Sequence, residues 1–120
     1  MIYRNSMNIT YTVNQHQQFQ VISLKGKLMH DADMSRLQTE LSAVLDQKEQ
    51  RIIYDLEHLE QMNSSGLNFI IRSLTKTRIN GGDLCLCKAQ GNVATLLTIS
   101  KVNEVITVYG NLEEAIHHLN

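Results

Sequence analysis

The chain has 120 residues, a mass of 13.7 kDa and a formal net charge of −1 at neutral pH. With 42% hydrophobic residues it can build one core, so we expect a single domain over 1–120 with its core at about 7–119. The balanced charge argues against direct nucleic-acid binding, which needs concentrated positive charge. No apolar run approaches the roughly 20 residues that insert across a bilayer. The first residues lack the apolar stretch of a secretory signal, which predicts a cytoplasmic protein.

Two short strands open the predicted fold. Residues 7–13 alternate between apolar and polar side chains, a pattern typical of a half-buried strand. Residues 14–18 are polar and are predicted to turn, and 19–24 form a second strand that ends at Gly26. Because the connection is so short, these two strands are expected to pair as an N-terminal hairpin.

Helical spacing begins after the hairpin. Apolar residues at steps of three and four predict a helix over 32–48, with Asp31 or Asp33 as its cap. The β-branched run at 51–56 is best interpreted as a central strand. A loop and a second amphipathic helix follow, and that helix is predicted to end at the Asn-Gly-Gly sequence of 80–82.

The remaining third of the chain repeats this alternation. It predicts a strand at 84–87, a short helix around 93–97, a strand at 105–109 and a last helix capped by Asn111. The order is therefore β-β-α-β-α-β-α-β-α. Such an order predicts the α/β class, with helices packed on a mostly parallel central sheet that carries the antiparallel hairpin.

Cys85 and Cys87 would lie on the same face of their strand and could in principle touch one metal ion. Zinc needs two further ligands at workable spacing, and no second cysteine pair or histidine pattern supplies them. We therefore predict two buried apolar side chains and no metal or cofactor. The chain also lacks phosphate-binding loops and nucleophile motifs, so we expect no catalytic residues and no enzyme. A thiol or redox role would rest on these two cysteines alone.

Residues 59–68 follow the predicted central strand and open the second helix, a position where parallel-sheet folds place ligands and contacts. Asn63, Ser64 and Ser65 are all helix-capping types, and one would suffice. A serine at a helix start is also a good phosphate position, because free N–H groups and the helix dipole stabilise the added charge. The residues alone leave a structural cap and a phosphorylation switch equally open.

The sequence Met62–Leu67 resembles the Asp-Ser-(Ser/Thr)-Gly-Leu signature of the STAS domain, the fold of bacterial anti-sigma factor antagonists. Three further segments resemble the family in the same order. They are 24–28 for the second strand with its Gly-Glu-(Leu/Ile)-Asp stretch, 53–59 for the strand before the signature, and 80–84 for the turn into the fourth strand. The resemblance runs from about residue 7 to residue 119.

The resemblance implies a regulatory partner. In the family, a serine-kinase anti-sigma factor binds the STAS protein and phosphorylates the first serine, here Ser64, with Ser65 as the alternative. Unphosphorylated protein holds the kinase and frees the sigma factor for transcription, and phosphorylated protein lets go. The residues expected at the partner surface are Asn63, Ser64, Ser65, Gly66, Leu67, Asn68 and Arg72. Asn68, Arg72 and Lys76 form a polar stripe, either a solvated face or a partner-binding track.

The chain departs from the family pattern at three acidic positions in two segments. Asn63 replaces the aspartate before the serines, and Met29 replaces the aspartate of the second-strand stretch, with Lys27 in place of its glutamate. If those carboxylates assist phosphoryl transfer, the reaction would be slower here or need a divergent kinase. The alternative function is a STAS scaffold subunit of a larger signalling or transport complex, without phosphorylation. A weak homodimer is left open.

Overall fold

The computed structural model describes residues 8–119, and side chains up to residue 117. The elements of this part of the chain are β1 (Ile9–His16), β2 (Phe19–Leu28), α1 (Asp31–Leu45), β3 (Arg51–Met62), α2 (Ser64–Ile79), β4 (Asp83–Cys87), α3 (Gly91–Ile99), the 3-10 helix η1 (Val102–Glu104), β5 (Val108–Tyr109) and α4 (Leu112–Leu119). The strands form one sheet in the order β1-β2-β3-β4-β5. β1 runs antiparallel to β2, and all other neighbours are parallel. The predicted element order, hairpin and α/β class are confirmed.

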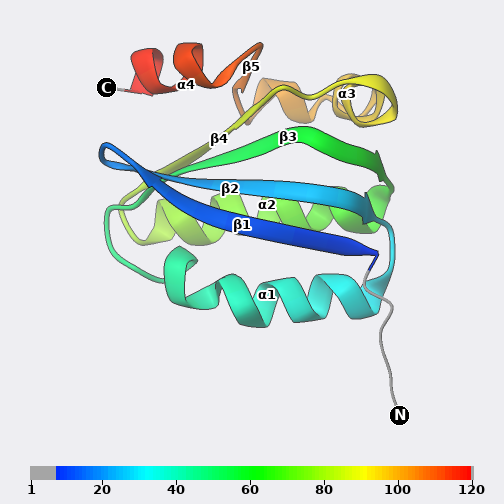
Figure 1. Ribbon diagram of the computed structural model, residues 1–120, viewed down its shortest axis with the longest axis horizontal. Coiled ribbons are helices and arrows are strands. Elements are labelled where there is room, and N and C mark those ends of the chain that lie inside the picture. Colours follow the sequence, from blue (N-terminus) through cyan, green and yellow to red (C-terminus); the bar gives the residue numbers. More distant parts are fainter. Residues whose placement is uncertain (1–7, 120) are drawn as a thin grey trace.

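The helices lie in two layers, one on each side of the sheet (Figure 1). α1 and α2 cover one face, where the larger core forms around side chains such as Leu37, Tyr54 and Ile70. α3 adds Val93 and Leu97 to this same core, whereas α4 lies on the other face, against β4 and β5. A smaller core there includes both cysteines beneath Ala115 and Ile116 of α4. Each strand of the centre is therefore buried on both faces, as expected for parallel strands.

The hairpin is longer than the sequence predicts. β1 continues through the polar residues 14–16, so the turn is only Gln17 and Gln18. The strand tolerates polar side chains there because that end of β1 is exposed on both faces. β2 also continues past Gly26 to Leu28. Gly26 has a φ of +113°, and a Cβ there would lie 2.2 Å from the backbone oxygen of Asn8. The glycine therefore kinks the strand instead of ending it.

β3 is twice as long as the predicted strand at 51–56, because the expected loop continues the strand to Met62. Its second half pairs only with residues 25–28 of β2, where Leu28 lies opposite Met62. The pairing shifts register twice in this region, and Leu56, Leu59 and Met62 are buried at steps of three. Apolar and polar residues therefore do not alternate in 57–62, and for this reason the sequence pattern indicated a loop there.

The ends of two helices can be compared with the sequence-based expectations. Neither Asp31 nor Asp33 caps α1; the N-cap residue is His30, with no side-chain cap hydrogen bond, and both aspartates lie in the first turn. α1 ends at Leu45, three residues before the predicted end. Asn111 does cap α4, since its Oδ1 accepts the Glu114 N–H at 2.8 Å.

The predicted strand at 105–109 is reduced to Val108 and Tyr109. Its first two residues close η1, because the N–H groups of Val105 and Ile106 both donate to the carbonyl of Val102. β-branched residues favour strands, but here the local hydrogen bonds prevail. Of the predicted first strand, Met7 lies outside the described residues.

Candidate partner-binding site

Asn63 joins two segments at the end of the sheet. As N-cap of α2, its Oδ1 accepts the Gly66 N–H at 3.0 Å. Its Nδ2 donates to the backbone oxygen of Met29 at 2.9 Å, and its backbone N–H donates to the oxygen of Leu28. The side chain thus satisfies one orphan donor of the helix and ties the β2–α1 turn to the helix start. The capping task that the sequence left open is performed by Asn63.

Ser64 and Ser65 are the first two residues of α2. Within the described residues, no group forms a hydrogen bond with either hydroxyl. Ser64 is exposed, whereas Ser65 is half-buried. Their backbone N–H groups lie in the first turn and have no carbonyl four residues earlier within the helix. The start of α2 therefore presents a free serine hydroxyl beside unpaired donors and the positive end of the helix dipole.

Gly66 and Leu67 build the site from inside. A Cβ on Gly66 would lie 2.4 Å from the backbone oxygen of Leu28 and 2.8 Å from Cγ of Met62, so α2 can approach the end of β2 only at a glycine. Leu67 is 7% exposed and packs in the larger core. These two residues shape the helix start, and their contact with a partner stays a prediction.

A shallow groove runs between α1 and α2 beside Ser64. Its α2 wall consists of Ser65, Asn68 and Arg72, and its α1 wall includes Asp31 and Gln38. Both signs of charge therefore face the groove. The structure brings together three of the residues that the sequence assigned to a partner surface. It separates the last member of the polar stripe, Lys76, which forms an ion pair with Asp46 at 3.0 Å.

Two of the positions that depart from the family pattern, 29 and 63, contact each other. Asn63 donates to the backbone of Met29, whose side chain is 36% exposed. An asparagine amide both accepts and donates hydrogen bonds, whereas an ionised aspartate only accepts. An aspartate at position 63 could cap α2 but could not bond to the Met29 carbonyl. The sequence pattern does not predict this contact. The only hint in the sequence is that positions 63 and 29 both depart from the family pattern.

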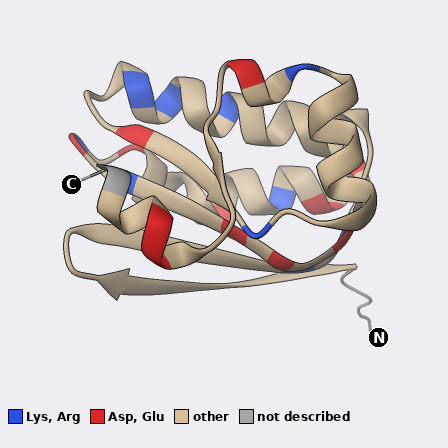
Figure 2. Cartoon of the chain, turned by 90° about the horizontal axis from the view of Figure 1, so that it is seen from above, with Lys and Arg blue, Asp and Glu red and all other residues tan. Residues whose placement is uncertain are grey.

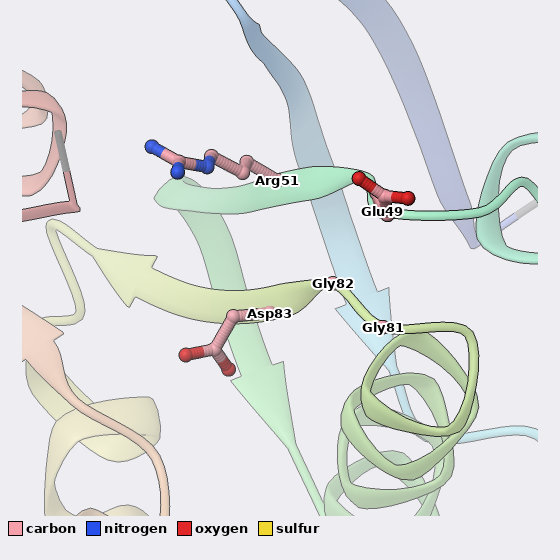
Figure 3. Close-up of a pocket in the computed structure, with 5 residues that line it drawn as sticks. All are labelled: Glu49, Arg51, Gly81, Gly82 and Asp83. Atoms are coloured by element: carbon pink, nitrogen blue, oxygen red, sulfur yellow. The ribbon is translucent and has the colours of Figure 1, made fainter.

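A second pocket lies at the opposite ends of β3 and β4, where Glu49, Arg51, Gly81, Gly82 and Asp83 line it. Figure 3 shows the three charged side chains extending in different directions, without converging on one point. Asp83 also forms an ion pair with Arg78 outside this set. The pocket does not include the residues around Ser64.

The cysteines are buried as predicted, and burial raises the pKa of both thiols to about 12. Neighbouring groups contribute to these raised pKa values after burial, namely Cys87 and Asp83 for Cys85, and Asp55 for Cys87. Both are therefore protonated and weakly nucleophilic at neutral pH. The part of the chain that the structure describes contains no cluster of three or more residues suited to hold a metal ion.

Basic and acidic residues are interspersed on the helices and on the inner strands in Figure 2, whereas β1 carries none. Between residues 8 and 119, no helix combines the length and the apolar character needed to cross a membrane.

Comparison with known proteins identifies the family. The STAS domain model matches residues 10–115, and the chain belongs to the STAS domain family. A similar protein is the anti-sigma F factor antagonist of Paenibacillus polymyxa, which is 28% identical over 114 residues, covering 94% of this chain and 97% of that protein.

Solved structures show the same fold. An anti-sigma factor antagonist from Mycobacterium paratuberculosis superimposes with a TM-score of 0.82 at 20% identity, covering 92% of this chain and 93% of that one. The Bacillus cell fate determinant SpoIIAA in its phosphorylated form superimposes with a TM-score of 0.67 at 19% identity, covering 92% of this chain and 100% of that one.

Proposed function

We propose that this protein is an anti-sigma factor antagonist, which captures a serine-kinase anti-sigma factor and releases it when Ser64 is phosphorylated. Release of the kinase would then control transcription by the sigma factor that the kinase holds. The observation that carries the proposal is that Asn63, and not Ser64, caps α2. Asn63 performs the capping, so the exposed hydroxyl of Ser64 is left without a described hydrogen bond, in the serine position of the family signature.

The choice of Ser64 over Ser65 rests on exposure. Ser64 is exposed, and Ser65 is half-buried and lines the groove between α1 and α2. A kinase must bring the hydroxyl in line with the terminal phosphate of ATP, which an exposed residue permits. In the transfer, the Ser64 oxygen bonds to phosphorus as the terminal phosphoanhydride bond breaks. ADP leaves, and the hydroxyl proton passes to a base of the kinase.

The same geometry supports a switch that changes binding without unfolding the protein. Phosphorylation adds about −1.5 to −2 charges at the helix start. The N–H groups of Ser64 and Ser65 and the helix dipole favour a negative group there, so the fold tolerates it. A partner seated over the start of α2 meets this new charge. While Ser64 is unphosphorylated, the groove residues Asn68 and Arg72 would contact the partner.

The test measures affinity for the host's serine-kinase anti-sigma factor by titration calorimetry. We expect Ser64→Asp to weaken capture and Ser64→Ala to keep it in the presence of ATP, when wild-type protein is phosphorylated and released. Thr75→Asp is the matched control, because it adds the same charge at another exposed position of α2 outside the groove, and it should leave the affinity unchanged. Equal affinity of wild type and Ser64→Asp would contradict the switch. If this protein instead binds a larger assembly and is never phosphorylated, the scaffold alternative holds.

A further inference from the structure

Among the described residues, β1 forms an edge of the sheet that no further strand covers. It pairs with β2 alone, and its residues from Thr12 to His16 are all exposed. In Figure 1 the closed end of this hairpin extends beyond the C-terminal end of α1. β1 contains no charged residue and no proline, and it is uncoloured along its length in Figure 2. Proteins usually block an edge strand with charges, proline, bulges or a covering segment, because its free N–H and C=O groups recruit another strand.

The hydrogen bonds show which backbone groups point outward. The oxygen of Asn8 accepts the N–H of Lys27 at 2.7 Å and therefore faces β2. Ile9, the next residue, points the other way, since its oxygen accepts Nη2 of Arg36 at 2.7 Å. Alternation along the strand then directs the N–H and C=O groups of the next odd-numbered residues away from β2. These residues, which we call the open edge, are Tyr11, Val13 and Gln15.

We propose that the open edge pairs with the open edge of a second copy of this chain. The two β1 strands would run antiparallel about a two-fold axis at Val13, so that the two sheets join into one. Val13 then lies opposite its own copy, and Tyr11 lies opposite Gln15 of the second molecule. Each opposed pair exchanges two backbone hydrogen bonds. This register uses every group of the open edge and leaves the bond between Arg36 and Ile9 intact.

The side chains favour a copy of the same strand as the occupant. Identical strands can face each other without like-charge repulsion because β1 carries no charged residue. The Val13 side chain is 37% exposed, and pairing would place it against another valine. Thr12 would lie opposite Asn14 on the other face. The start of α2 lies at the opposite end of the sheet from the hairpin turn, so the dimer leaves Ser64 accessible in both molecules (Figure 1).

The first measurement is sedimentation equilibrium over a wide range of protein concentration. An interface formed by one strand pair falls below the roughly 1,200 Å² of stable complexes, so dimerisation should be weak and concentration-dependent. Val13→Lys places two ammonium groups opposite each other and should raise the dimer dissociation constant at least about tenfold. Val105→Lys makes the same exchange at another exposed valine outside β1 and should leave it unchanged. A wild-type monomer at every concentration, or a dimer that Val13→Lys does not weaken, overturns the proposal.

Amide hydrogen exchange then tests the register residue by residue. The N–H groups of Tyr11, Val13 and Gln15 should exchange more slowly as the protein concentration rises. Those of Thr12 and Asn14 already face β2 and should not respond. A dimer in which the odd-numbered amides stay unprotected would place the interface elsewhere and overturn the proposal. Neither measurement involves a kinase, so the result is independent of the role of Ser64.

Discussion

Replacing Asn63 by alanine removes two side-chain hydrogen bonds from the start of α2. One joins Oδ1 to the Gly66 N–H at 3.0 Å, and the other joins Nδ2 to the Met29 oxygen at 2.9 Å. Loss of an N-cap costs about 1 kcal/mol, and loss of a further hydrogen bond costs about the same. We therefore expect Asn63→Ala to lower the free energy of unfolding by about 2 kcal/mol.

Asn63→Asp separates the two bonds. The carboxylate still accepts the Gly66 N–H and interacts favourably with the helix dipole, but it cannot donate to Met29. We expect this variant to lie between wild type and Asn63→Ala, about 1 kcal/mol below wild type. Its remaining cap should keep the Gly66 amide protected from exchange, whereas Asn63→Ala should expose it.

Urea unfolding followed by circular dichroism gives these values, with Asn68→Ala as the matched control. Asn68 lies on the same helix, is exposed and forms no side-chain hydrogen bond with a described residue, so its replacement should change the stability by less than about 0.5 kcal/mol. If Asn63→Ala proves as stable as Asn68→Ala, then Asn63 does not join the two segments. Another residue would then have to cap α2, and Ser64 would not be relieved of that role.

Four further predictions concern the packing at Gly66 and in the two cores. Gly66→Ala should destabilise the protein by more than about 2 kcal/mol, because its Cβ would lie 2.4 Å from a backbone oxygen. Gly110→Ala is the control in the same urea assay. It should cost far less, because its Cβ would meet only the flexible carboxylate of Glu114. Ser73→Ala should cost about 1–3 kcal/mol by leaving the buried hydroxyl of Tyr54 without its partner at 2.7 Å, and Tyr54→Phe in that background should recover part of the loss. The two buried thiols should resist alkylation of the native protein at neutral pH, and labelling as fast as in urea would contradict their burial. Because their pKa is raised from 9.0 to about 12, the unfolded state loses these protons first, and stability should fall as pH rises above about 9 in an alkaline titration followed by circular dichroism.

Hydrophobic periodicity predicts the order of elements in this chain because most elements bury a regular face. The helix α2 follows this rule closely, whereas β4 is recognised by a short continuous apolar run that is buried on both faces. The pattern fails where burial depends on a strand's neighbour. In β3 the buried residues Leu56, Leu59 and Met62 are spaced by three, because the register with β2 shifts twice. Only the paired strands together determine that spacing, so one segment of sequence cannot reveal it.

At the candidate site, too, the sequence reveals local features but not the contacts that the fold creates. The signature and its place at a helix start are local features, and both are visible in the sequence. The assignment of the cap to Asn63 is not, because three capping residues stand in a row and only the geometry selects one. The bond from Asn63 to Met29 joins residues 34 positions apart, so the meeting of these two departures from the family pattern requires the fold.

The central claim is that Ser64 carries a reversible phosphate, and phosphopeptide mapping of the protein purified from its native host tests it most directly. Samples taken across growth and stress conditions, with their intact masses, show how much of the protein is modified. We predict a singly phosphorylated form whose phosphate maps to Ser64 and whose abundance changes with the condition. Protein that is unmodified in every condition, or phosphorylated only at Ser65, would contradict the account.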